Sequence, residues 1–148
     1  MGGEVRMKVL LPIDGSPCSR HAVEHVIASR ARWGDGGAMD IHLVNVQPTV
    51  SGDISQFVSS TQLAAYHAEE STKALAEARA LLDAVGLKYT VHTRTGHAAA
   101  EIAALADALQ CDQIVMGTHG RGALAELLVG GTTLRVVHLT KMPVLLVK

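Results

Sequence analysis

The segment 116–133, MGTHGRGALAELLVGGTT, carries an early cluster of glycines and a later glycine pair, Gly130-Gly131. It follows a short apolar run at 113–116 that is typical of a buried parallel strand, so the glycines begin where a strand ends and a helix starts. Glycines let the backbone approach a ligand closely, and the free N–H groups at a helix start favour an anion. The segment therefore predicts an anion-binding turn after the strand and a second one at 130–133.

The rest of the chain alternates between strand-like and helix-like segments. Residues 7–13 form an apolar run typical of a central strand, and Asp14-Gly15-Ser16-Pro17 then ends it, with Ser16 as a helix N-cap. Further strands are expected at 39–46, 87–93, 113–116 and 142–147. Helices are expected to about residue 33, up to Gly86, around Ile102 to Leu109, after Gly122, and through Val136 to Leu139. The start of the helix that ends at Gly86 cannot be placed from its sequence, because residues 54–65 lack a clean apolar stripe.

This regular alternation predicts an α/β fold: a doubly wound, parallel five-stranded sheet with helices on both faces, in one domain spanning 1–148. In such sheets the ligand crevice lies beyond the carboxyl ends of the strands, where the winding order reverses. With strand order 3-2-1-4-5, that point falls between the first and fourth strands. Asp14 and Gly117 should then meet at one crevice.

Composition narrows the class of function. The formal charge is −1 and aromatic residues make up 3% of the chain, which disfavours nucleic acid as a partner. No apolar run has membrane-spanning length and no signal-peptide core is visible, so we expect a cytoplasmic protein that does not bind membranes. Cys18 and Cys111 should lie at opposite edges of the sheet, which argues against a disulfide.

The spacing of Gly117, two residues, Gly120, nine residues and Gly130 resembles the nucleotide-binding signature of the universal stress protein family, G-2x-G-9x-G-[ST]. Residues 11–16 and 143–147 resemble the family's first and last strands, so the likeness covers essentially the whole chain. It implies a stress-response protein that binds ATP or AMP. It leaves open whether Mg²⁺ accompanies ATP. It also implies a homodimer formed by antiparallel pairing of the strand Pro143 to Val147. One departure is Gly131, which stands where the signature has Ser or Thr.

Roles for the residues follow from this resemblance and from their chemistry. Backbone N–H groups of the glycine segment would hold phosphates, Asp14 would accept hydrogen bonds from ribose or adenine, and Val46 aligns with the family position whose backbone meets adenine. The predicted nucleotide contacts are Pro12, Asp14, Val46, Met116, Gly117, His119, Gly120, Arg121, Gly122, Gly130, Gly131, Thr132 and Thr133.

Each of these patterns also has a purely structural interpretation. Asp14 could be a turn residue, Gly117 and Gly120 could form a tight strand-to-helix turn, and His119 could be structural or solvent-facing. Gly130-Gly131 could end one helix while Thr132 or Thr133 caps the next.

A rival chemistry is suggested by His21, Glu24 and His25, which match the zinc pattern H-x-x-E-H, with Cys18 one turn earlier. These residues fall beside the apolar stripe, where solvated side chains are ordinary, and no third-ligand motif follows. The glycine segment has no Walker lysine and no clear Mg²⁺ carboxylates, which favours a binding module with at most slow ATP hydrolysis over a fast enzyme. A dimeric interaction protein that no longer binds nucleotide is the other alternative, and it draws on Gly131.

Overall fold

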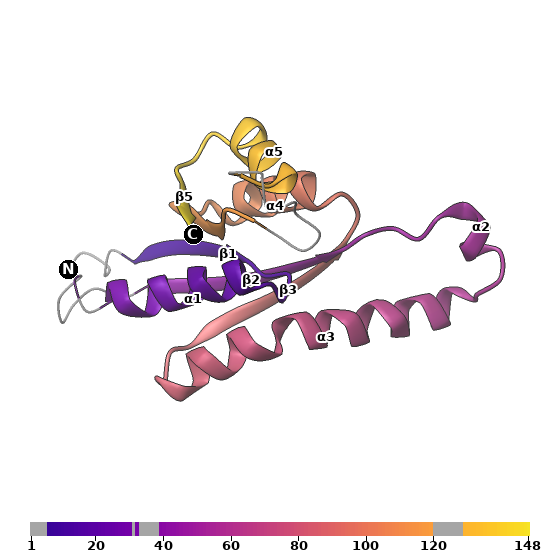
Figure 1. Ribbon diagram of the computed structural model, residues 1–148, viewed down its shortest axis with the longest axis horizontal. Helices are drawn as coiled ribbons and strands as arrows, with labels where there is room; N and C mark the ends of the chain where they lie inside the picture. The colour runs from indigo at the N-terminus through magenta and orange to yellow at the C-terminus, as the bar shows by residue number, and fades with distance from the viewer. Residues whose placement is uncertain (1–5, 31, 33–38, 120–128) are drawn as a thin grey trace.

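A computed structural model describes residues 6–30, 32, 39–119 and 129–148 of the chain. Strands and helices alternate along it (Figure 1). The elements are β1 (Met7–Pro12), α1 (Pro17–Arg30), β2 (Met39–Gln47), α2 (Gly52–Ser55), α3 (Ser60–Ala84), β3 (Tyr89–Thr95), α4 (Ala98–Leu109), β4 (Gln113–Gly117), α5 (Gly131–Leu139) and β5 (Val144–Val147). The helix expected after Gly122 lies outside the described residues.

The five strands form one parallel sheet in the order β3-β2-β1-β4-β5, which confirms the predicted topology. The winding order reverses between β1 and β4, since the chain proceeds from β1 toward β3 on one side and from β4 toward β5 on the other. Parallel strands end at the same edge of the sheet, so Asp14 after β1 and Gly117 at the end of β4 leave it together.

Helices cover both faces of the sheet, α1 and α3 on one and α4 and α5 on the other (Figure 1). Successive side chains of a strand point to opposite faces, and the two cores follow that alternation. Val9 and Leu11 of β1 pack in the core beneath α1 and α3, whereas Leu10 packs in the core beneath α4 and α5. Because both faces are covered, the central strand β1 is apolar and buried from Val9 to Pro12, as the run at 7–13 predicted.

Two predicted strand starts were two residues too early. The third strand begins at Tyr89 instead of Leu87, because the Leu87 amide still donates to the Leu82 carbonyl in the C-terminal cap of α3 (3.1 Å). The last strand begins at Val144 instead of Met142, whose amide donates to the Thr140 hydroxyl oxygen (3.3 Å) and is held in a turn. The predicted positions of both strands within the sheet are correct.

The long helix α3 begins at a capping box that our sequence analysis missed. The Ser59 hydroxyl oxygen accepts from the Gln62 amide (3.1 Å), and the Gln62 side chain accepts from the Ser59 amide (2.9 Å). The pattern Ser-x-x-Gln at 59–62 is the signal that could have located this start. With its N-terminus fixed there, the first half of α3 extends beyond the sheet, next to α2 (Figure 1).

Candidate functional site

The exit of β1 holds Asp14 in a defined position. The Ile13 amide donates to the Val44 carbonyl (2.8 Å), which keeps the end of β1 paired with β2. Asp14 Oδ1 then accepts from the Ser16 amide (2.9 Å) in an Asx-type turn. Gly15 adopts φ +83°, and a side chain there would also contact the backbone of Ala74 in α3 at 3.4 Å. The carboxylate is thus positioned by its own turn and by the packing of Gly15 on α3.

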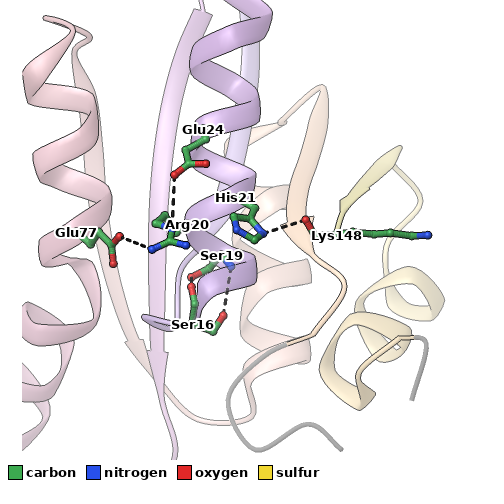
Figure 2. A network of polar contacts seen from close by, with 7 residues as sticks. All are labelled: Ser16, Ser19, Arg20, His21, Glu24, Glu77 and Lys148. Carbon is green, nitrogen blue, oxygen red and sulfur yellow. Dashed lines mark hydrogen bonds and ion pairs between the residues drawn. The ribbon is translucent and has the colours of Figure 1, made fainter. Parts of the chain in front are cut away.

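The helix that follows is anchored at its start and on two sides. Ser16 is the N-cap that the sequence predicted: its hydroxyl oxygen accepts from the Ser19 amide (3.2 Å). Figure 2 shows Arg20 of α1 reaching Glu77 of α3 (3.3 Å), while the ring of His21 lies against the Lys148 carbonyl oxygen (Nδ1 to O, 3.0 Å). These contacts fix α1 between α3 and the residue after β5.

Gly117 ends β4 where it packs directly on the first turn of α1. A Cβ placed on Gly117 would lie 2.5 Å from Cys18 Cβ and 2.7 Å from the Cys18 carbonyl carbon. Gly117 is therefore required by the close approach of α1, and its φ is not in the positive range. The predicted reason for glycine here was close approach to a ligand; the structure shows close approach to a helix of the same chain.

Two hydrogen bonds join the two ends of the glycine segment, and a third ties its start to β5. The Thr118 amide donates to the Val147 carbonyl (3.0 Å), and the Gly130 amide donates to the Thr118 carbonyl (2.6 Å). The buried Thr133 hydroxyl donates to the Gly117 carbonyl (3.0 Å). Residues 118 and 130 are consequently neighbours at the end of β4, and α5 begins at the same edge of the sheet as Asp14.

The start of α5 offers backbone donors at this edge. Gly130 is the N-cap and has no side chain to accept from the first turn, so the amides of Gly131, Thr132 and Thr133 have no hydrogen-bond acceptor within the described part of the chain. Together with the helix dipole they form a potential anion site. The exposed Thr132 could add its hydroxyl, whereas the Thr133 hydroxyl already donates its proton to Gly117.

Apolar residues line the sheet side of this edge. Met116 and Pro12 are buried, and Val46 is half-buried and packs against the same core cluster as Met116, on the face covered by α4 and α5. The structure therefore brings the end of β2 and the end of β4 to one side of the sheet, with β1 between them. That arrangement would offer an apolar surface to a base.

Gly120, Arg121 and Gly122 lie outside the described residues, so their predicted contacts remain predictions. His119, the last described residue before them, is half-buried. Its Nδ1 is buried and has no hydrogen-bond partner among the described residues.

A buried polar network behind Asp14 was not predicted. Asn45 Nδ2 donates to the Ile13 carbonyl (2.8 Å), and Asn45 Oδ1 accepts from the Ser71 hydroxyl (2.8 Å) and the Gln47 side chain (2.9 Å). Asn45 is 2% exposed, so these partners satisfy an amide that would otherwise be costly to bury. A single Asn inside the apolar strand IHLVNV was the available signal.

The alternative zinc site finds no support within the residues that the structure describes. No group of three or more His, Cys, Asp or Glu side chains there could hold a metal ion. Glu24 lies 3.5 Å from Arg20 Nε in an i,i+4 ion pair, and His21 contacts the Lys148 carbonyl (Figure 2).

Cys18 and Cys111 are both free thiols, and burial raises the pKa of Cys111 to about 11. Among the described helices none is both long and apolar enough to cross a membrane.

The chain is similar to known proteins in both sequence and structure. The profile of the universal stress protein family matches residues 6–148. The universal stress protein MJ0531 of Methanocaldococcus jannaschii is 31% identical over 147 residues, which cover 99% of this chain and 85% of that protein. The solved structure of protein MJ0577, from the same organism, superimposes with a TM-score of 0.79 at 29% identity, covering 95% of this chain and 94% of that one. A universal stress protein solved in complex with cAMP has a TM-score of 0.68 at 22% identity, covering 96% and 97% of the two chains.

Proposed function

Since this chain belongs to the universal stress protein family, we propose that it is a stress-response protein whose crevice between β1 and β4 binds an adenine nucleotide. The observation that carries the proposal is that Asp14 and the first amides of α5, which have no acceptor among the described residues, lie at one edge of the sheet, at the point where the winding order reverses. That a universal stress protein of the same fold was solved with cAMP supports the ligand class.

In this proposal the start of α5 binds phosphate, and Asp14 accepts a hydrogen bond from the ribose hydroxyls. The amides of Gly131 and Thr132 would donate to phosphate oxygens, and the base would lie near Val46 and Met116. Gly120, Arg121 and Gly122 would complete the phosphate site. The Gly131 amide can serve although its side chain lacks the hydroxyl of the family signature.

The proposal predicts that Asp14→Asn weakens binding of ATP and AMP by about tenfold or more, since a hydrogen bond to a charged group contributes about 1.5–3 kcal/mol. Asparagine keeps the oxygen that accepts from the Ser16 amide, so the turn should persist. Isothermal titration calorimetry with each nucleotide measures the effect. The matched control is Asp112→Asn at the opposite edge, where Asp112 Oδ2 accepts from the Lys8 amide. Unchanged affinity in Asp14→Asn, or no saturable binding by the wild type, would overturn the proposal.

Selectivity between ATP and AMP should depend on Thr132. Its hydroxyl is exposed at the start of α5, whereas that of Thr133 is bound to Gly117. We therefore expect Thr132→Val to weaken ATP binding by about tenfold and AMP binding by much less, because only ATP brings a terminal phosphate. Titrations with and without Mg²⁺ would show whether the metal accompanies ATP. Equal losses for the two nucleotides would contradict this role of Thr132.

The second part of the proposal is a homodimer formed through β5. This strand is at the edge of the sheet, where unpaired backbone groups invite pairing with another chain. Apolar side chains on β5 and the adjacent α5 are exposed, which marks a surface suited to association: Leu134, Val137, Leu139 and Leu146. Antiparallel pairing of two β5 strands would pair the backbone N–H and C=O groups of the edge and cover this apolar surface.

A further inference from the structure

A cavity of about 670 Å³ opens under the first half of α3. Its walls come from three segments: the first turns of α3, the stretch that follows β2, and the end of β3. The residues that line it are Thr49, Val50, Ser60, Leu63, Ala64, His67, Ala68, Ser71, Thr93, Arg94 and Thr95. Its size is within the range of about 300–1,000 Å³ found for small-molecule sites.

This cavity is separate from the nucleotide crevice. It shares no residue with the predicted nucleotide contacts, and it lies at the β3 edge of the sheet, on the other side of β2 from β1 and β4. Like the crevice, it lies at the carboxyl ends of parallel strands, since Thr93 to Thr95 end β3. The capping box at Ser59 fixes the helix that forms its roof.

His67 lines the cavity with hydrogen-bonding groups that have no partner among the described residues. Both of its ring nitrogens are buried, and neither has a hydrogen-bond partner among the residues that the structure describes. A buried polar atom without a partner is costly, so a group that bonds to the imidazole inside the cavity would be favoured. The Ser71 hydroxyl, one turn along the helix, donates to Asn45 and makes no hydrogen bond to either ring nitrogen of His67.

The remaining lining indicates which ligand would fit. Val50, Leu63, Ala64 and Ala68 present apolar surface. Arg94 borders the cavity through its backbone, because side chains alternate along β3 and the Arg94 side chain lies on the face of His92, away from Tyr89 and Val91. No described lining residue is acidic, so a carboxylate would meet no like charge there, and its hydrogen bond to the imidazole N–H would be stronger than that of a neutral acceptor. We propose that this cavity binds a small organic acid with an apolar body, whose carboxylate contacts the imidazole of His67.

The test uses 4-phenylbutyrate as a probe and 4-phenylbutan-1-ol as its uncharged match. Each is titrated into the ¹⁵N-labelled full chain while amide chemical shifts are followed. We expect saturable shifts at Leu63 to Ser71 and at Thr93 to Thr95 with the acid, and at least tenfold weaker binding of the alcohol. His67→Phe keeps the ring and removes both nitrogens, so it should weaken the acid about tenfold and leave the alcohol unchanged. Saturating ATP should not displace the acid.

Two alanine variants on α3 provide the steric control. Ala68 lines the cavity and is exposed enough to accept a larger side chain, whereas Ala65 is exposed on the same helix and does not line it. Ala68→Trp should abolish binding of both probes, and Ala65→Trp should bind as the wild type does. The proposal would be overturned by the absence of saturable shifts, by shifts confined to Gly117 and the start of α5, by equal affinity for acid and alcohol, or by an acid affinity that His67→Phe leaves unchanged.

Discussion

Gly117 is the residue at which adding a single methyl group should lower the free energy of unfolding most. An added methyl group would lie 2.5 Å from Cys18 Cβ and 2.9 Å from the Cys18 carbonyl oxygen, and the backbone atoms of α1 cannot move aside without displacing the helix. We expect Gly117→Ala to lower the free energy of unfolding by about 1–3 kcal/mol or more, as overpacking does in rigid cores. Urea denaturation of the full chain measures this.

Gly131 provides the control for that substitution. A Cβ there meets nothing within 4 Å, and the residue is already the first of α5. Gly131→Ala should therefore leave stability unchanged or raise it by about 0.4–1 kcal/mol, through the lower entropy of the unfolded chain. A loss of stability in Gly131→Ala equal to that in Gly117→Ala would contradict the steric account of Gly117.

The residue scale also shows what could not be predicted from sequence. The glycine spacing predicted that the backbone at Gly117 approaches a ligand, and no local pattern shows that Cys18, about a hundred residues earlier, packs against it. The same holds for the Thr133 hydroxyl, whose acceptor, the Gly117 carbonyl, no local pattern indicates. Both partners are set by the packing of α1 and α5 on β4, which depends on the whole fold.

At the scale of elements, β2 and the edge strand β3 are joined by a pair of histidines. The rings of His42 and His92 are stacked with centroids 5.1 Å apart, and His42 Nδ1 lies 2.9 Å from His92 Nε2, so a single proton is shared between these two nitrogens. Asp40 Oδ1 is 3.2 Å from His42 Nε2, without hydrogen-bond alignment. Burial first, then the charges of His42 and Arg94, lower the pKa of His92 below its ordinary value of 6.5.

This pair should make the stability of the protein depend on pH. Because the pKa of His92 is lower in the folded chain, the unfolded chain binds the proton more readily, and stability falls as the pH drops below about 6.5. Above that pH His92 is neutral in both the folded and the unfolded chain, so it adds no pH dependence to the free energy of unfolding. We expect His92→Gln, which can still donate to His42, to flatten the decline between about pH 6.5 and 5 in urea denaturation. His97→Gln on the adjacent loop is the control, and equal slopes in wild type and His92→Gln would contradict this role.

Elements with a strong apolar period were predicted, whereas the start of α3, which lacks one, was missed. The run at 7–13 and the stripe of Ala22, Val23 and Val26 lead directly to β1 and α1, because burial on the sheet determines both. The start of α3 lacks such a stripe because its first half extends beyond the sheet. Its boundary is set by the capping box at Ser59.

For the whole molecule, the candidate crevice was predictable because it follows from topology. A parallel sheet of order 3-2-1-4-5 must bring the ends of its first and fourth strands together, so the meeting of Asp14 with Gly117 requires no knowledge of side-chain packing. The cavity beneath α3 was not predictable in this way. It depends on how far α3 continues past the sheet, and no apolar periodicity in the sequence indicates that length.

The proposed dimer is the prediction that belongs to the molecule as a whole. Leu146 is 37% exposed on the edge strand β5, and a charge there would be buried without a partner if two β5 strands paired. We expect the wild type to sediment as a dimer and Leu146→Arg as a monomer of nearly unchanged stability, since the side chain reaches solvent in the single chain. Val85→Arg, an equally exposed position (36%) at the end of α3, is the matched control and should remain dimeric. A monomeric wild type, or a dimer that persists in Leu146→Arg, would show that β5 is not the interface, and the exposed side chains of α5 would then need another explanation.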